Sequence, residues 1–181
     1  MPVVLGGTLT EIAILQGRVD DYVAWVRSLG LDLIEVSDGS ITLDHGDKTA
    51  LIRRLVAEGF KVMSEVGSKD NAEIMAPYRW VEQIQAELEA GAWKVICEGR
   101  ETGTAGIARP DGELRQGLID EIAHAVDPAR IVFEAPQKDQ QVVLIRRFGP
   151  DVNLGNIPPA EVLPLETMRL GLRNDTLELD G

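Results

Sequence analysis

The stretch IVFEAPQKDQQ, residues 131–141, decides the fold that we predict for this chain. Its first three residues are apolar and either β-branched or aromatic, which indicates a short buried strand. The strand ends at Glu134, and a proline, a lysine and several glutamines crowd into the loop that follows. An apolar strand that ends in a carboxylate and a polar loop is typical of a parallel sheet whose strand ends form a site.

Three other apolar runs end in the same way. LIEV, KVMSEV and KVICE bring Glu35, Glu65 and Glu98 to or near their C-terminal ends, and the loops VSDGS, VGSKD and GRETGTAG follow them. Two further runs, VVLGG at 3–7 and DVNLG at 151–155, bring the number of predicted strands to six. The runs are continuous rather than alternating, as expected for strands that are covered on both faces.

Helical patterns lie between these strands. They are predicted over residues 20–29, 48–59, 79–91, 114–126, 140–148 and 161–172. Strands that alternate with helices indicate βαβ units and a parallel sheet. Acids at the ends of several successive strands favour a barrel, because an open sheet gathers its ligand contacts at one switch point. We therefore predict one α/β domain over residues 1–181, a TIM (β/α)8-type barrel of about six βα units.

The composition of the chain limits which binding partners and which cellular location are expected. The net charge of −12 argues against nucleic acid or an anionic membrane as a binding partner. No run is apolar and long enough to cross a bilayer, and the N-terminal residues lack an export signal. The single cysteine, Cys97, permits no internal disulfide and fits a reducing compartment. A cytoplasmic location is therefore expected.

Four carboxylates that converge on one mouth repel one another, so a divalent cation or basic side chains must offset their charge. Oxygen ligands without histidine or thiolate suit Mg²⁺. Lys69, Arg100 and Lys138 lie in the same loops, as binding of a phosphorylated or carboxylated substrate requires. The alternative is that these acids and bases are buried ion pairs that only connect strand ends.

Two loops and two histidines are less specific. VNLGNI, 152–157, suits phosphate binding by backbone N–H groups, although most sequences of this kind form simple turns. GGT at 6–8 is an equally weak signal of the same type. The loop ETGTAG is either a lid or a solvated connection. The sequence context of His45 and His124 favours a surface position or a local hydrogen bond over a role as a metal ligand.

The strand ends taken together resemble the phosphosulfolactate synthase family. The matching motifs run in order from residue 6 to residue 176: GGTLTE, IEVSDGSI, SEVGSKD, ICEGRETGTAGI, FEAPQKDQQ, VNLGNI and LETMRLGLRNDT. The resemblance implies a (β/α)8 barrel and a Mg²⁺-dependent carbon–sulfur lyase. The implied reaction adds sulfite to phosphoenolpyruvate and gives 2-phospho-3-sulfolactate, a step towards coenzyme M or sulfolactate.

The resemblance also suggests a role for each strand-end residue. Lys69 is expected to be the general acid, and Arg100 and Lys138 are expected to hold sulfite or phosphate. The glutamates expected to hold or orient Mg²⁺, not all of them directly, are Glu35, Glu65, Glu98 and Glu134. The residues expected to donate to substrate oxygens are the amides Gln137 and Gln141 and the phosphate-binding pair Gly155 and Asn156.

GGTLTE corresponds to the third strand of the family pattern, so this sequence has six units where the family has eight. Its end strands, VVLGG and DVNLG, would then present unpaired edges, which invite pairing with another chain. Three interpretations follow. The chain is part of a longer enzyme, or it is an enzyme whose barrel is completed by association, most simply as a homo-oligomer. The third interpretation is a non-catalytic binding or structural protein. A related barrel enzyme acting on another phosphorylated enol or keto acid is a further alternative.

Overall fold

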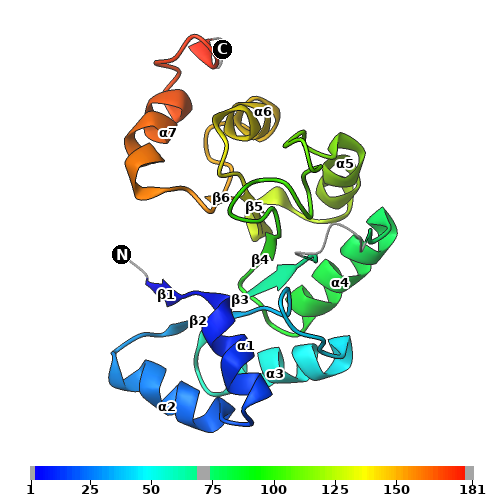
Figure 1. Ribbon diagram of the computed structural model, residues 1–181, viewed down its shortest axis with the longest axis vertical. Helices are drawn as coiled ribbons and strands as arrows, with labels where there is room; N and C mark the ends of the chain where they lie inside the picture. The colour runs from blue at the N-terminus through cyan, green and yellow to red at the C-terminus, as the bar shows by residue number, and fades with distance from the viewer. Residues whose placement is uncertain (1–2, 69–73, 178–181) are drawn as a thin grey trace.

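The computed structural model describes residues 3–68 and 74–177, and within them six strands form one sheet in sequential order. All five neighbouring pairs are parallel. The strands are β1 (Val4–Leu5), β2 (Leu33–Val36), β3 (Lys61–Val66), β4 (Lys94–Cys97), β5 (Ile131–Glu134) and β6 (Leu154–Gly155). They curl into a half-barrel with β1 at one end and β6 at the other (Figure 1).

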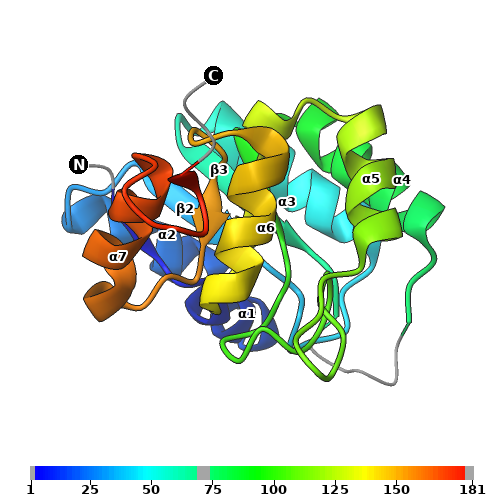
Figure 2. The ribbon, with the colours of Figure 1, turned by 90° about the horizontal axis from the view of Figure 1, so that it is seen from above.

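Helices cover the outer face of this arc (Figures 1 and 2). They are α1 (Gly7–Leu15), α2 (Val19–Ser28), α3 (His45–Ala57), α4 (Pro77–Glu89), α5 (Gln116–Ala125), α6 (Lys138–Phe148) and α7 (Val162–Arg169), with short 3-10 turns η1 (Pro128–Arg130) and η2 (Pro159–Glu161). None of the helices in the described ranges is long and apolar enough to span a membrane. The predicted α/β fold, a TIM-type barrel of about six βα units, is confirmed, and its six strands form a half-barrel.

Alternation along each strand separates a helix-facing side from a concave side. The helix-facing residues are fully buried and include Ile34, Val62, Val95, Ile131 and Phe133. The concave side carries Met63, Ile96 and Val132. Because side chains repeat every two residues, Glu65, Glu98 and Glu134 follow these three on the same side. The strand period therefore places apolar residues deep in the arc and carboxylates at its rim.

Helix α1 is the element that the sequence pattern does not predict. It buries Thr10 and Glu11 and leaves Leu9, Ile12 and Leu15 exposed. This distribution is the reverse of the usual apolar stripe that identifies a helix in a sequence. Glu11 can be buried because its carboxylate accepts hydrogen bonds from the Ser37 hydroxyl, at 2.6 Å, and from the backbone N–H of Ser40. A polar contact between distant segments decides this helix, so GGT at 6–8 is its start and not a simple turn.

Candidate active site

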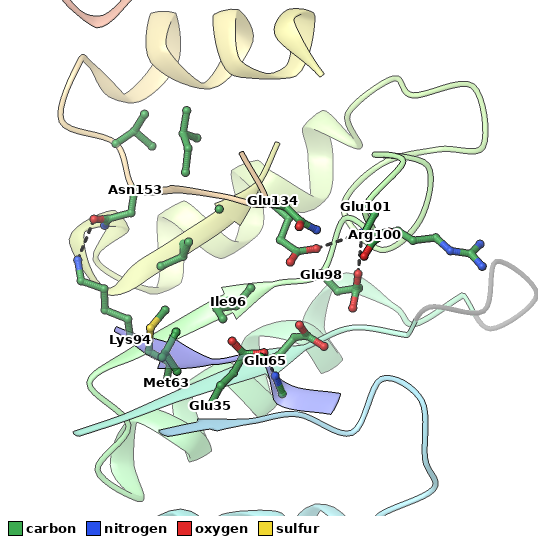
Figure 3. A pocket seen from close by; sticks show the side chains of 18 of the residues that line it. Glu35, Met63, Glu65, Lys94, Ile96, Glu98, Arg100, Glu101, Glu134 and Asn153 are labelled. Atoms are coloured by element: carbon green, nitrogen blue, oxygen red, sulfur yellow. Dashed lines mark hydrogen bonds between the residues drawn. The ribbon is translucent and has the colours of Figure 1, made fainter. Parts of the chain in front are cut away.

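The concave side of the half-barrel encloses a cavity of about 1220 Å³ (Figure 3). Its apolar lining comes from the strands and includes Val4, Met63, Ile96, Val132 and Leu154. Its acidic rim comprises the four strand-end glutamates, Glu35, Glu65, Glu98 and Glu134. These are the four carboxylates predicted from the sequence to share one mouth, and the parallel register brings them there.

The backbone after β4 binds two of these carboxylates. The N–H of Gly99 donates to Glu134 Oε2 at 2.8 Å. The N–H of Arg100 donates to Glu98 Oε1 at 2.6 Å and to Glu134 Oε2 at 3.1 Å. Arg100 adopts the left-handed conformation, with φ of 66°, which turns both N–H groups toward the same side. A strained residue thus forms an anion-binding turn between Glu98 and Glu134.

Glu98 lies close enough to Glu134 to affect the ionisation of Glu134. Burial, and after it the neighbouring charge of Glu98, together raise the pKa of Glu134 to about 7. The N–H of Gly99 and the side chain of Asn156 lower this pKa in part, because they donate to the ionised form. Near neutral pH, Glu134 therefore exchanges a proton readily, and a cation between the two carboxylates would keep both ionised.

Replacing Glu134 by glutamine should stabilise the metal-free protein at high pH only. Above about pH 7 wild-type Glu134 is ionised in both folded and unfolded states, and its burial costs on the order of 2 to 3 kcal/mol. Below about pH 4.5 it is protonated in both states and this cost disappears. Urea unfolding with a chelator should show Glu134→Gln more stable at about pH 8 and equal to wild type at about pH 4.5. A difference that does not depend on pH would contradict this assignment.

Glu35 is held by the start of α1. The N–H of Gly7 donates to Glu35 Oε1 at 2.8 Å, and the hydroxyl of Thr10 donates to the Glu35 carbonyl at 2.6 Å. A Cβ at position 7 would lie 2.5 Å from the same carboxylate oxygen, so a side chain does not fit there. Thr10 is a site-forming residue that the sequence did not single out, and Gly7 was noted only as part of the weak turn signal at 6–8. The signal that could have found them is GGTLT directly after a strand, the pattern of a strand followed by a helix N-terminus.

The three expected cations differ in position. Arg100 lines the cavity, but its side chain points away from the carboxylates (Figure 3). Lys138 lies at the start of α6, where its ammonium pairs with Asp175 Oδ2 at 2.5 Å, and it is absent from the cavity lining. Lys69 lies outside the described residues. Arg100 is thus the one expected cation that this cavity lining includes.

The effect of Arg100 can be divided between its side chain and its backbone. Arg100→Gly keeps the N–H group and suits φ of 66°, whereas Arg100→Ala keeps the strain. We expect both variants to raise the KM for an anionic substrate by about tenfold if the guanidinium binds it. We also expect Arg100→Gly to exceed Arg100→Ala in unfolding free energy by about 1 kcal/mol. A wild-type KM in Arg100→Gly would limit the role of Arg100 to its backbone.

The glutamines after β5 bind the loop that follows β4. Gln137 Nε2 donates to the Thr102 carbonyl at 2.7 Å. Gln140 Nε2 donates to the carbonyls of Gly103 and Gly112. The loop ETGTAG is therefore attached to α6 at the rim of the site. Gln141, also expected to contact substrate, is buried and donates to the Ala135 carbonyl at 2.9 Å.

The expected phosphate-binding residues do line the cavity. Gly155 ends β6 beside Glu134, and its carbonyl accepts from the N–H of Ala135. Asn156 follows in the left-handed conformation, with φ of 58°, and its side chain hydrogen-bonds with Glu134. Both residues therefore lie at the same rim as the paired carboxylates.

The donor set suits Mg²⁺ that shares its ligands with a substrate. Within residues 3–68 and 74–177, no three acidic, histidine or cysteine side chains form a group that could hold a metal ion. Mg²⁺ usually binds proteins through one or two carboxylates and completes its octahedron with water and substrate oxygens. Glu98 and Glu134, which share the anion-binding turn, provide such a pair.

Comparison with known proteins identifies the family of this chain. Residues 1–175 match the family described as (2R)-phospho-3-sulfolactate synthase (ComA). The chain is 46% identical over 175 residues to the phosphosulfolactate synthase of Methanothermobacter thermautotrophicus, covering 95% of this chain and 68% of that protein. It is 42% identical over 177 residues to the Bacillus subtilis phosphosulfolactate synthase, covering 96% of this chain and 70% of that protein. The chain therefore belongs to the phosphosulfolactate synthase family, a family of carbon–sulfur lyases.

Proposed function

We propose that this chain adds sulfite to phosphoenolpyruvate, with Mg²⁺, to give 2-phospho-3-sulfolactate. The observation that carries the proposal is a pair of carboxylates, the buried Glu98 and the half-buried Glu134, at the rim of a cavity in a chain of this family. The relatives that it matches are named phosphosulfolactate synthases. A cavity with acids for a metal ion and strand-end donors for oxyanions suits two anionic substrates.

The reaction balances without a leaving group. The sulfur of sulfite attacks the methylene carbon of phosphoenolpyruvate and forms the carbon–sulfur bond. The electron pair of the double bond moves toward the substrate carboxylate, and a proton then joins the carbon that bears the phosphate. Bound Mg²⁺ would offset the negative charge that develops on the carboxylate.

The residues of the cavity divide this work. Glu98 and Glu134 are proposed to hold the metal ion, and Glu35 and Glu65 to orient it and its water ligands. Gly155 and Asn156 are proposed to bind the phosphate through backbone and amide donors.

Five further residues keep their roles as predicted from the sequence. Lys69 is the proposed proton donor, and Arg100 and Lys138 the proposed cations for sulfite or phosphate. Gln137 and Gln141 support the rim of the cavity through their backbone contacts, which leaves direct substrate binding by either amide as a prediction.

The test is direct detection of the product. The purified chain is incubated with phosphoenolpyruvate, sulfite and Mg²⁺, and phosphosulfolactate is sought by mass spectrometry. Product that requires all three components would support the proposal. A folded protein that binds phosphoenolpyruvate and Mg²⁺ but forms no product would favour another phosphorylated enol or keto acid as substrate. A folded protein that binds neither would favour a non-catalytic role.

The open ends of the arc bear on the active form of the chain. In the described residues β1 pairs only with β2 and β6 only with β5. Helix α1, which follows β1 and packs against β2 and α2, exposes an apolar stripe in which Leu9 is 39%, Ile12 43% and Leu15 70% exposed. We propose that a second copy covers this end of the arc, since an open strand edge and an exposed apolar stripe each favour association.

Light scattering across a dilution series should show a concentration-dependent dimer for the isolated chain. Ile12→Lys on the α1 stripe should shift this equilibrium toward monomer by at least about tenfold, because an interfacial charge without a partner is costly. Arg18→Glu, on an exposed residue just after α1, is the charge-changing control. A chain that is monomeric at every concentration would contradict self-association.

A further inference from the structure

A buried ionic cluster lies between α3, α4 and the end of β3, behind the sheet as seen from the cavity. Lys48 is only 1% exposed, and its ammonium is 2.9 Å from Glu87 Oε1 and 2.8 Å from Asp38 Oδ1. Glu87 is itself completely buried, and His45 Nε2 lies 3.3 Å from the same oxygen. None of these four side chains lines the cavity.

The cluster keeps a charged lysine in the protein interior. Burial by itself lowers the pKa of the Lys48 ammonium, but the carboxylates of Glu87 and Asp38 outweigh that effect and the pKa is raised. Stability alone does not require such a cluster, because apolar residues of similar volume often serve as well or better. A contact other than the ion pairs is therefore needed to account for Lys48.

That contact is with the backbone of a strand end. Lys48 Nζ donates to the Glu65 carbonyl at 2.5 Å. The side chain of the same residue, Glu65, lines the cavity with its carboxylate. Asp38, the half-buried partner of Lys48, belongs to the loop after β2, next to Ser37, whose hydroxyl donates to Glu11. One ammonium thus connects the ends of β2 and β3 to α4.

We propose that Lys48 is a positioning residue: it fixes the C-terminal end of β3 and thereby the direction in which the Glu65 carboxylate enters the cavity. The inference rests on the proposed function, in which Glu65 orients Mg²⁺ and its water ligands. Without this contact the Glu65 peptide can rotate, and a small rotation at the backbone moves the carboxylate at the end of a three-bond side chain by much more. Groups that orient metal ligands commonly change affinity by about 10- to 100-fold when removed.

The decisive variant is the double substitution Lys48→Met with Glu87→Gln. It removes the contact to Glu65 without leaving a buried charge alone, so we expect the fold to persist. Glu87→Gln by itself breaks the ion pair between Lys48 and Glu87 but keeps the hydrogen bond from Lys48 to the Glu65 carbonyl. Arg54→Met, on the exposed side of the same helix, is the surface control.

Two readouts separate positioning from stability. In the metal-free protein, amide hydrogen exchange in the peptide 61–68 should accelerate at least about tenfold in the double variant, with no change in 131–134. The Mg²⁺ dissociation constant, measured by calorimetry, should rise about 10- to 100-fold in the double variant and stay within about twofold in Glu87→Gln and Arg54→Met. Adding Glu65→Gln to the double variant should change that constant little further.

The outcomes are distinct. Unchanged hydrogen exchange and unchanged Mg²⁺ affinity in the folded double variant would overturn the proposal. Equal losses of Mg²⁺ affinity in the double variant and in Glu87→Gln would overturn it as well. If the wild-type chain binds no Mg²⁺, the metal part of the proposed function fails, and hydrogen exchange still decides whether Lys48 holds the end of β3. Should the double variant not fold, Lys48→Arg keeps the charge while misplacing the donor, and the same two readouts apply.

Discussion

Glu98→Gln is expected to lower kcat/KM by about 10³-fold or more, the largest effect on activity that this structure predicts. Glu98 is fully buried at the rim of the cavity, and one of its oxygens already accepts from the backbone of Arg100. Glutamine keeps the size of the side chain but removes the charge that would hold Mg²⁺. The loss should therefore appear in Mg²⁺ binding as well as in turnover.

Steady-state kinetics over a range of Mg²⁺ concentrations, together with calorimetry, measure the effect of Glu98→Gln. Glu121→Gln, which makes the same chemical change on the exposed surface of α5, is the matched control and should behave as wild type. A Glu98→Gln variant that retains both wild-type turnover and wild-type Mg²⁺ affinity would remove Glu98 from the site.

Gly106→Ala is expected to cost about 3 kcal/mol or more of unfolding free energy, since a left-handed backbone and a backbone clash both penalise it. Gly106 has φ of 56°, and a Cβ at this position would lie 1.9 Å from the carbonyl oxygen of Glu98. The next residue, Ile107, donates its N–H to that same oxygen at 2.8 Å. The loop therefore cannot accept a side chain without moving the Glu98 peptide.

Urea unfolding measures this cost, and Gly117→Ala is the control. Gly117 lies near the start of α5, where an added Cβ meets nothing within 4 Å. Alanine is favoured over glycine in helices by up to about 1 kcal/mol, so Gly117→Ala should be neutral or stabilising. Equal stabilities for the two alanine variants would show that the loop adjusts freely around Glu98. The same loop shift should weaken Mg²⁺ binding in Gly106→Ala, because it displaces Glu98.

The polar residues of IVFEAPQKDQQ serve two purposes that the sequence does not separate. Glu134 enters the cavity, whereas the amides of Gln137 and Gln140 bind the loop that carries Arg100. The strand end thus supplies one carboxylate and the support for the backbone turn that binds it. Support of this kind is expected around a site whose groups must keep a fixed geometry.

The local pattern by itself determined the strands, the parallel βα order, and the gathering of four glutamates at one rim. The bounds of β2 and β3 agree with the predicted runs LIEV and KVMSEV. These properties follow from the sequence because a buried strand is a continuous apolar run and parallel strands all end at the same edge. The family motifs at those ends could be read in the same way, without knowledge of their neighbours in space.

Only the tertiary structure decided which polar groups meet. Lys48 lies on the apolar stripe of α3 with Ile52 and Leu55, a signal of burial, but its partners Glu87 and Asp38 come from separate elements. Likewise, helix α1 buries Glu11 because Ser37 and Ser40 are folded against it. A charged group is stable in the interior only where distant segments supply its partners, and no local pattern encodes that meeting.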